Sequence, residues 1–334
     1  MTRAHRPPDP SGAVPERAER VVAEVLGWYA GHQRDLPWRS ADRTPWGVLV
    51  SEVMLQQTPV DRVVPYWTSW LQRWPTPRRL AGSTTADAVR AWGRLGYPRR
   101  ALRLHAAALA CVERFGGAVP SSYEDLRTLP GVGDYTAAAV VAFGFGGAAV
   151  VLDTNVRRVL ARVFVGRALP GPSVTVAERV LGAAVLPVGP RVAATWSVAV
   201  MELGALVCTA RSPDCGGCPI APDCRWLAAG SPPAQGPARP TQRFTGTDRQ
   251  VRGLLLAVLR EDDAAVPSHR LDTVWPDPVQ RDRALATLVA DGLAEALPGG
   301  TYQLPQRGSR HRVSTVGPSY GNENLSTRRK PTDS

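Results

Sequence analysis

Residues 129–133, Leu129-Pro130-Gly131-Val132-Gly133, separate two stretches with helical periodicity, at about 122–128 and 134–143. Two glycines in three residues allow a tight turn and a close approach of the backbone to another molecule. The free N–H groups at the start of the following helix can hold a phosphate without reading a base. An ordinary turn between two helices fits the same residues. The pentapeptide therefore predicts a hairpin between helices and leaves DNA binding open.

Helical patterns continue on both sides of this hairpin. Apolar residues recur at helical spacing from Glu16 to about His32. Further helices are expected over roughly 46–57, 60–74, 85–94, 99–115, 154–165, 174–186 and 190–208. Short breaks with Gly or Pro separate them, and alternating strand patterns are not evident. The region 15–229 therefore predicts an all-α core.

The composition changes after this core. Residues 230–244 are rich in Pro, contain Gly, Ser and Gln, and predict a linker. Two helices (249–260 and 278–291), a short segment between them (270–274) and two segments around the turn 298–300 follow. That order predicts a small winged-helix-like domain over 245–305, although a small α+β bundle without a role in DNA binding fits equally well. Residues 1–14 and 306–334 are expected to be a disordered leader and tail.

The charge of the chain points to a polyanionic partner. Its 334 residues carry a formal net charge of +11, with a sequence pI of about 10.2. Such an excess favours nucleic acid, although part of it lies in the C-terminal tail. No apolar run reaches the roughly 18 residues of a membrane span, and residues 1–15 lack the apolar segment of a secretory signal. We therefore expect a cytoplasmic protein that does not enter a membrane.

Lysine is almost absent. Of the 40 Lys and Arg residues, 39 are Arg, and the single lysine is Lys330 in the predicted tail. A reaction that needs a lysine amine to form a Schiff base is therefore excluded for the predicted globular part.

Four of the five cysteines crowd into 17 residues with the spacing C-x6-C-x2-C-x5-C. Four thiolates so close in sequence can surround one metal centre, and sulfur ligands suit zinc or an iron–sulfur cluster. The spacing alone does not separate these two metals. The fifth, Cys111, lies in a helical pattern among leucines and is expected to be a buried apolar residue. The ligand candidates are Cys208, Cys215, Cys218 and Cys224.

Two carboxylates stand out by their neighbours. Glu52 lies in a predicted helix that includes Ser51 to Thr58, on a half-apolar face. A carboxyl there would be partly desolvated, and its pKa would rise as a general acid requires. Asp153 follows an apolar run, 149–152, and opens a helix. A solvated glutamate and a simple N-cap aspartate are the alternatives. Two carboxyl groups in unlike environments are what cleavage of a glycosidic bond requires, one as proton donor and one to stabilise the sugar cation.

Together these residues resemble the MutY-type adenine DNA glycosylases of the helix-hairpin-helix superfamily. The resemblance covers about residues 16–230. It includes 36–39 (Leu-Pro-Trp-Arg), 51–58, 96–97 (Gly-Tyr), the hairpin, 152–156 (Leu-Asp-Thr-Asn-Val) and the four cysteines. It implies a two-lobed all-α core with the active site in a cleft, and a [4Fe–4S] cluster on those cysteines. The implied substrate is double-stranded DNA with adenine opposite 8-oxoguanine or guanine, the adenine being flipped out of the stack.

The resemblance also implies roles for single residues. Glu52 would donate a proton to adenine, Asp153 would stabilise the sugar cation with support from Asn155, and Tyr135 would hydrogen-bond in the active site. Trp38 and Arg39 would line the adenine pocket, and Tyr97 and Gln57 would wedge into the duplex. For these last two, a packing aromatic and a solvated side chain are the alternatives. The full set expected to contact substrate or DNA is Trp38, Arg39, Gln56, Gln57, Thr58, Tyr97, Gly131 and Gly133.

The endonuclease III type shares the cysteine spacing, the hairpin and the aspartate. It resembles this chain less because it uses a lysine two residues after the hairpin, where Tyr135 stands here. The chain is therefore predicted to be a monofunctional glycosylase that leaves the abasic site uncut. Three departures from the adenine-specific pattern bear instead on a turn, on a contact with the base and on the preference for 8-oxoguanine over guanine. Thr154 replaces the glycine of an Asp-Gly-Asn motif, Val198 replaces a Glu or Gln that contacts adenine, and residues 245–305 are too short for the usual nudix-like C-terminal domain.

The alternatives are a glycosylase for another mispaired base, such as thymine opposite guanine, a non-catalytic DNA-binding protein, and a zinc-binding structural protein. Glu52 favours adenine, because departure of a purine gains most from a proton donor. We predict a monomer, in the cytoplasm and associated with the nucleoid.

Overall fold

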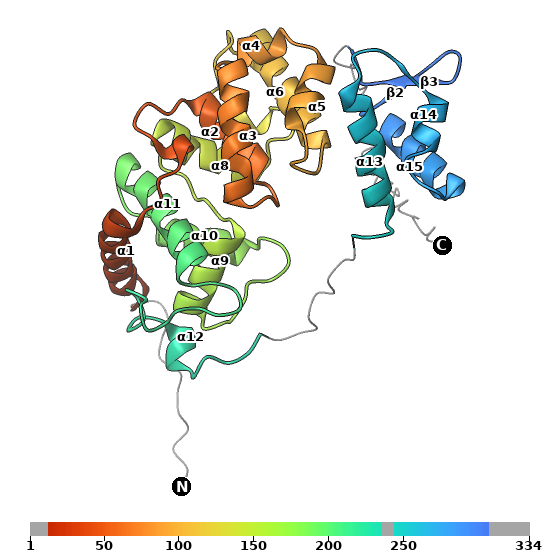
Figure 1. Cartoon of the computed structure of the whole chain (residues 1–334). Coiled ribbons are helices and arrows are strands. Elements are labelled where there is room, and N and C mark those ends of the chain that lie inside the picture. Colours follow the sequence, from red (N-terminus) through yellow and green to blue (C-terminus); the bar gives the residue numbers. More distant parts are fainter. Residues whose placement is uncertain (1–12, 235–243, 307–334) are drawn as a thin grey trace, which may run out of the picture.

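The computed structural model describes residues 13–234 and 244–306, and the predicted leader and tail lie outside them except for their inner ends. The larger part is helical (Figure 1), as predicted, and α1 begins two residues inside the predicted leader. Its helices are α1 (Ala13–His32), α2 (Pro45–Leu55), α3 (Val60–Arg73), α4 (Pro77–Ala81), α5 (Thr85–Trp92), α6 (Arg99–Arg114), α7 (Tyr123–Arg127), α8 (Asp134–Ala139), α9 (Thr154–Leu160), α10 (Val176–Ala184), α11 (Pro190–Leu206) and α12 (Arg225–Ala228).

Short non-α turns complete this part. A 3-10 turn, η1 (Pro37–Arg39), precedes α2. Two π-helical segments, η2 (Val140–Gly144) and η3 (Ala161–Val165), continue α8 and α9. The sequence patterns joined each π segment to the helix before it, because side-chain periodicity changes little over one turn. They missed α4 and α12, which are too short to show a period.

Two apolar cores divide the helices into two lobes. The first is built mainly on α2–α8, contains five buried tryptophans, among them Trp70 and Trp92, and continues into residues 251–304. The second is built on α1, α9 and α11, around residues such as Val25, Leu160 and Leu203. The chain therefore starts in the second lobe, builds the first and returns (Figure 1). This is the two-lobed arrangement that the resemblance implied.

The end of α2 differs from the prediction. The helix was expected to end at about Gln57 or Thr58, but it ends at Leu55. Gln57 has φ of 60°, a left-handed conformation that ends a helix. The buried guanidinium of Arg100 replaces the missing helical hydrogen bonds. It donates to the carbonyls of Val53 and Gln56, at 2.9 and 2.6 Å. A long-range contact therefore ends the helix, and apolar periodicity could not reveal it.

The hairpin joins α7 to α8 as predicted. Gly131 has φ of 81°, and a Cβ there would lie 2.8 Å from the Cβ of Arg103. Only glycine fits both the conformation and the space. Gly133 is the N-cap residue of α8, and both glycines are exposed. Leu129 and Val132 are buried, and they anchor the turn in the apolar core.

The C-terminal module, defined by its elements α13 to β3, is α13 (Asp248–Glu261), β1 (Val266–Pro267), α14 (Ser268–Asp272), α15 (Pro278–Ala290), β2 (Glu295–Leu297) and β3 (Thr301–Gln303). Its antiparallel sheet has the order β1-β3-β2, with Val266 opposite Tyr302 and Leu297 opposite Thr301. This order of helices and strands is that of a winged helix, as predicted. The two-residue strand β1 was not predicted, because it is too short to show alternation.

The module packs against the first lobe beside α5 (Figure 1). Arg260 donates to the Val89 carbonyl at 3.0 Å, and Arg90 donates to the Asp262 carbonyl at 2.9 Å. Each contact uses a cation of one part and a backbone oxygen of the other. Burial lowers the pKa of Arg260 to about 10. Within 13–234 and 244–306, none of the helices has the length and apolar character to cross a membrane.

Candidate active site

A cleft of about 870 Å³ takes its walls from both lobes. Seven residues singled out from the sequence line it, although they come from four separate stretches of the chain. They are Trp38, Arg39, Glu52, Thr58, Tyr135, Asp153 and Asn155. The fold therefore brings together the residues that the sequence could only propose one by one.

Glu52 lies in the middle of α2, whose residues 46–54 are all buried. Thr44 caps the helix and Pro45 begins it, so that its first turn is well defined. The Glu52 side chain is 4% exposed and is not the solvated helix residue that was the alternative. Burial raises its pKa to about 7, and the nearby charge of Asp153 adds to this increase. The Tyr135 hydroxyl and the Arg39 cation act in the opposite direction. Near neutral pH this carboxyl is therefore protonated in part.

Asp153 is both the N-cap of α9 and a cleft residue. Its carboxylate accepts the Val156 N–H at 2.6 Å and the Asn155 amide at 2.7 Å. Burial raises the pKa of Asp153, whereas these donors and the Arg158 cation lower it. The capping interpretation and the functional interpretation of this residue are therefore compatible. Thr154, which replaces a glycine of the family pattern, is the first residue of α9 and has no positive φ. This position does not need a glycine here.

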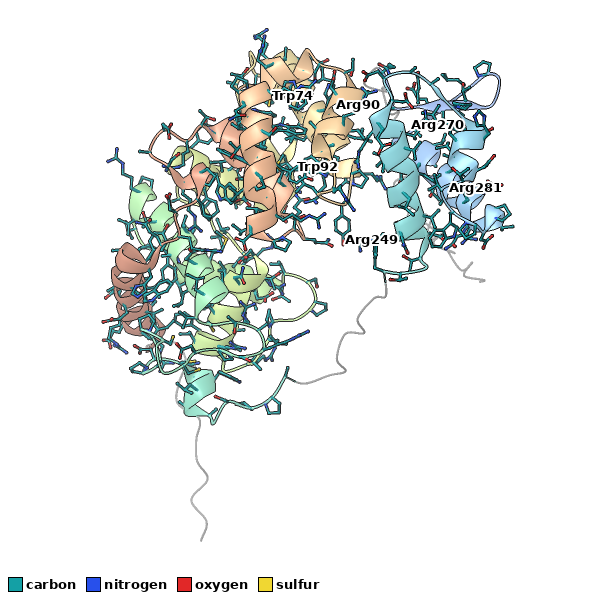
Figure 2. All side chains as sticks on the ribbon, viewed as in Figure 1. Trp74, Arg90, Trp92, Arg249, Arg270 and Arg281 are labelled. Carbon is teal, nitrogen blue, oxygen red and sulfur yellow. The ribbon has the colours of Figure 1, made fainter. Side chains whose placement is uncertain are left out.

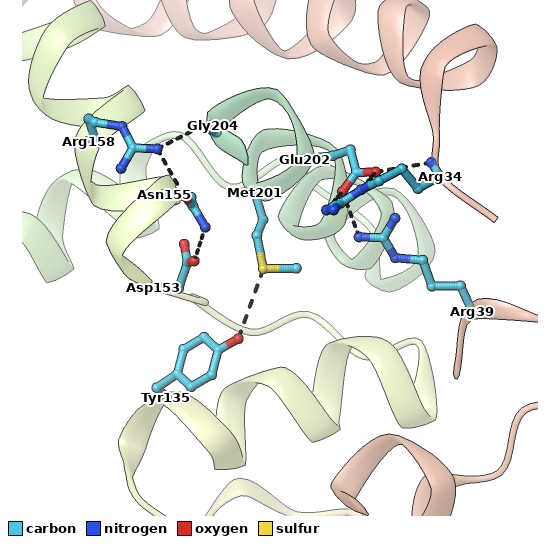
Figure 3. Close-up of polar contacts among 9 residues, drawn as sticks. All are labelled: Arg34, Arg39, Tyr135, Asp153, Asn155, Arg158, Met201, Glu202 and Gly204. Atoms are coloured by element: carbon cyan, nitrogen blue, oxygen red, sulfur yellow. Dashed lines mark hydrogen bonds and ion pairs between the residues drawn. The ribbon is translucent and has the colours of Figure 1, made fainter. Parts of the chain in front are cut away.

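Arg158 extends this hydrogen-bond network away from the cleft (Figure 3). Its Nη2 donates to the Asn155 side-chain oxygen at 2.8 Å and to the Gly204 carbonyl at 2.6 Å. Its Nε donates to the Cys208 carbonyl at 2.7 Å. One guanidinium thus connects the loop of four cysteines to the residue that holds Asp153. Sequence reasoning missed Arg158, although its spacing of three residues from Asn155 on a helix was a usable signal.

Tyr135 is the second residue of α8, immediately after the hairpin. Burial and the neighbouring carboxyl of Glu52 raise its pKa well above 10, so its hydroxyl remains a donor at neutral pH. Its oxygen lies 4.0 Å from the Met201 sulfur on α11 (Figure 3). Tyr135 therefore lines the cleft, with its hydroxyl directed toward α11.

Glu202 is a second residue that the sequence reasoning missed. It is fully buried in α11, and it binds Arg34 at 2.7 Å and Arg39 at 2.9 Å (Figure 3). Burial alone would raise its pKa, but the hydrogen bonds from these two cations lower it to about 2. The sequence signal that could have revealed Glu202 is that it is the single carboxylate in the mostly apolar run 193–206. Val198 lies one turn earlier and lines the cleft without a polar group.

The other predicted DNA contacts do not line the cleft. Gln57 and Tyr97 are exposed, and they have φ of 60° and 46°, which is unusual for residues with side chains. Arg100 holds their two loops together, because it donates to the Gln56 carbonyl and, at 3.1 Å, to the Gly96 carbonyl. It also donates to the Thr58 hydroxyl at 2.9 Å.

Gln56, which is half-buried, and the hairpin glycines Gly131 and Gly133 also lie outside the cleft. Backbone strain of the kind found at Gln57 and Tyr97 is common at functional sites and is costly elsewhere.

The four predicted cysteine ligands surround a second, small cavity together with Ile220 and Trp226. Arg162 places Nη1 3.2 Å from the Cys208 sulfur and stacks on the Trp226 ring at 4.6 Å. None of the four is in a disulfide. Among the described residues, no three His, Cys, Asp or Glu side chains converge as the ligands of one metal ion would. The four soft donors and the cation beside them fit a negatively charged iron–sulfur cluster. The candidate ligands around this cavity are Cys208, Cys215, Cys218 and Cys224.

Comparison with known protein families shows to which class of DNA repair protein this chain is similar. Residues 50–181 match the family described as HhH-GPD superfamily base excision DNA repair protein. Residues 208–224 match the iron-sulfur binding domain of endonuclease III, so the cysteine loop is an iron–sulfur site of the [4Fe–4S] type. The fold agrees, because the chain is similar to a thermostable thymine-DNA glycosylase with a TM-score of 0.59 and 25% identity. That match covers 65% of this chain and 99% of the other.

Relatives with higher sequence identity show the family within this class. The chain is 49% identical over 305 residues to an adenine DNA glycosylase of Mycobacterium tuberculosis, covering 91% of this chain and 99% of the relative. It is 50% identical to that of Mycolicibacterium smegmatis, covering 86% and 97%, and 43% identical to that of Homo sapiens, covering 62% and 40%. The chain belongs to the adenine DNA glycosylase family.

Proposed function

We propose that this chain is a monofunctional DNA glycosylase that hydrolyses the N-glycosidic bond of adenine mispaired with 8-oxoguanine or guanine. Its family membership supports the reaction, and the observation that carries the proposal is the carboxyl pair Glu52 and Asp153 in one cleft. Two carboxyl groups in unlike surroundings fit a reaction in which each acid has a separate role. Double-stranded DNA is the macromolecular partner, and the adenine enters the cleft after leaving the base stack.

In the proposed reaction, Glu52 gives its proton to a ring nitrogen of adenine. The bond between C1′ and the base then breaks, its electrons stay with the base, and neutral adenine leaves. Asp153 remains ionised, because the Val156 N–H and the Asn155 amide stabilise its charge. Its charge stabilises the sugar cation until water adds to C1′, and the Glu52 carboxylate takes up the proton that the water releases. The products are free adenine and an abasic site.

Tyr135 supports the monofunctional part of the proposal. Its hydroxyl stays protonated and donates a hydrogen bond in the cleft, but it cannot form a Schiff base with the sugar. No lysine other than Lys330 is present in the chain. A lysine-dependent cut of the strand is therefore not part of the proposed activity.

Trp38 and Arg39 are proposed to form the adenine pocket. The Trp38 ring packs edge-on against Trp67, with centroids 5.8 Å apart, and so has a defined orientation. Arg39 is fixed by its ion pair with Glu202. Because Val198 offers no hydrogen bond, we assign the polar contact with the base to Arg39 rather than to α11.

The DNA-binding surface is proposed to lie at the edge of this cleft. Tyr97 and Gln57 would enter the duplex, and their strained loops are held by one buried cation, Arg100. A rigid wedge loses little entropy when it binds. Gln56 and Thr58 would contact the strand beside the wedge, and the N–H groups around Gly131 and Gly133 would bind a phosphate.

The iron–sulfur site is proposed to use all four cysteines as ligands. When bound, the cluster cross-links residues 208–224 and so fixes the end of α11, where Gly204 accepts its hydrogen bond from Arg158. We further propose that residues 15–229 are the catalytic core, 230–244 a linker and 245–305 a separate domain. The protein is proposed to act as a monomer near the nucleoid in the cytoplasm.

Removal of thymine opposite guanine is the second candidate, because a thymine-DNA glycosylase has the same core fold. The raised pKa of Glu52 disfavours it, since protonation at a ring nitrogen helps a purine leave more than a pyrimidine. A zinc protein would be colourless, whereas an iron–sulfur protein absorbs near 400 nm.

The test uses the purified protein with duplexes that carry adenine opposite 8-oxoguanine, adenine opposite guanine, thymine opposite guanine, or thymine glycol. Strand breaks are scored with and without alkali. We expect breaks at adenine only, and only after alkali. Excision of thymine, or breaks without alkali, would contradict the substrate or the monofunctional assignment, respectively.

A further inference from the structure

The C-terminal module reaches the surface on which Tyr97 lies. Arg249, in the first turn of α13, places its guanidinium carbon 4.4 Å from the centroid of the Tyr97 ring. The guanidinium carbon of Arg100 lies 5.5 Å from the same ring. Figure 2 shows Arg249 at the lower end of α13, on the side toward the first lobe. One exposed aromatic ring therefore contacts a cation of each part of the molecule.

This placement is held by several contacts. Arg260 and Arg90 tie the far end of α13 to α5 through backbone carbonyls. Asp291 of the module pairs with Arg99 of the first lobe at 3.2 Å and with Arg252 of α13 at 2.5 Å. These contacts place the first turn of α13 beside Tyr97.

The positive charge of Arg249 is available to bind an anion. Its neighbour Asp248 is paired with Arg283 at 2.7 Å and also accepts from the Gln280 amide. Among the described residues, no carboxylate forms an ion pair with Arg249, and its side chain is exposed. A guanidinium that lies over a ring still presents its N–H groups at its edge, where a phosphate can accept them.

We propose that the C-terminal module is part of the DNA-binding surface through α13, with Arg249 as its contact residue. Arg249 binds a backbone phosphate next to the step that Tyr97 enters, and it holds the Tyr97 ring in its strained orientation. This inference rests on the proposed role of Tyr97 as a wedge. It differs from the usual mode of a helix-turn-helix, in which the second helix, here α15, enters the major groove.

The test measures binding of the full-length protein to a duplex with 2′-fluoro-deoxyadenosine opposite 8-oxoguanine. The fluorine disfavours the sugar cation, so the DNA stays intact. A 2-aminopurine beside the mispair reports unstacking by its fluorescence. We expect Arg249→Ala to weaken binding about tenfold and to reduce the slope of log K against log salt by about one. It should also reduce the 2-aminopurine signal.

Two further variants sharpen this test. Arg249→Lys keeps the charge but not the planar stack, so we expect the salt slope of the wild type with a reduced 2-aminopurine signal. Arg270→Ala removes one cation from α14, away from Arg249 (Figure 2), and should leave the signal and the slope nearly unchanged. Absorbance near 400 nm and circular dichroism verify that each variant is folded.

Two outcomes would overturn the proposal. Either Arg249→Ala binds as the wild type does, or Arg270→Ala causes a loss as large as Arg249→Ala, which would assign DNA binding to α14 and α15. The assay reads binding and not excision. If the protein failed to excise adenine while the Arg249 effects appeared, the proposed function would be wrong and the role of the module would stand.

Discussion

The middle of α2 and the start of α9 each place one carboxyl group in the same cleft, but they surround it differently. Glu52 is enclosed by apolar residues of its own helix, and its pKa rises to about 7. Asp153 is half-buried, and desolvation raises its pKa too, but it accepts an N–H and an amide at 2.6 and 2.7 Å and lies in the field of Arg158, which act against this increase. Burial alone therefore does not set the charge of a group. Hydrogen-bond donors help to decide which of the two acids keeps the proton.

The two lobes also differ in the hydrogen-bond donors and cations that they supply. The lobe of α2 is an apolar core with several tryptophans, and it offers Glu52 few donors. The lobe of α9 contains the cations Arg158 and Arg162, which bind carbonyls and a sulfur of the cysteine loop. The cleft lies between them. Each prediction below changes one side of this contrast.

The largest effect is expected for Glu52→Gln, which keeps the shape of the side chain and removes its proton. Excision of adenine should fall roughly 10⁴-fold in single-turnover assays, with DNA affinity retained, because general acid catalysis contributes up to about that factor. The wild-type rate should fall about tenfold per pH unit above pH 7, since the acid must be protonated and its pKa is about 7. A variant with near-normal excision would remove Glu52 from the mechanism.

Asp153→Asn should lower the excision rate roughly 10³-fold, because the charge that faces the sugar cation is lost. Asparagine is as good an N-cap as aspartate, so the free energy of unfolding should change little. Thermal unfolding and single-turnover rates on the same preparation separate the two effects. If stability drops and the rate does not, Asp153 is only a cap.

The pH dependence of stability tests the Glu52 environment without any substrate. The folded-state pKa of about 7 exceeds the ordinary 4.5, so the folded protein holds this proton more tightly than the unfolded chain does. The resulting stability is fully present below about pH 4.5 and is lost as the pH rises through about 7. The loss is roughly 3 kcal/mol.

Glu52→Gln has no proton to lose. Its unfolding free energy should therefore exceed that of the wild type by more at pH 8 than at pH 5, as measured by urea unfolding at both pH values. An equal difference at the two pH values would mean that Glu52 is not desolvated.

The smallest effect is expected for Arg158→Gln. Loss of the cation behind Asn155 should reduce the excision rate about tenfold and should move the acidic limb of the pH profile to higher pH, because Arg158 lowers the pKa of Asp153. Arg157→Gln is the matched control. Arg157 lies next on the same helix but pairs with Glu178 at 2.9 Å, away from Asp153. Equal rate losses in both variants would indicate general damage to α9.

Much of the site could be predicted because its residues lie in short motifs. The hairpin, the cysteine spacing and the apolar neighbours of Glu52 are local features, and local features are visible in a sequence. The end of α2 was predicted wrongly, because Arg100 ends it from more than 40 residues away. Glu202 and Arg158 had local signals in the sequence, but these did not reveal their long-range partners Arg34 and Cys208.

The sequence by itself determined which chemical groups the protein has. It contains two carboxylates in apolar contexts, four clustered thiols, a glycine hairpin and no lysine before residue 330. These choices follow from composition and short spacing, which do not depend on the fold. Only the tertiary structure decided which acid holds the proton, which cations fix the cleft, and that the C-terminal module lies beside Tyr97. Protonation and orientation depend on desolvation and on partners distant in sequence, and folding alone creates these.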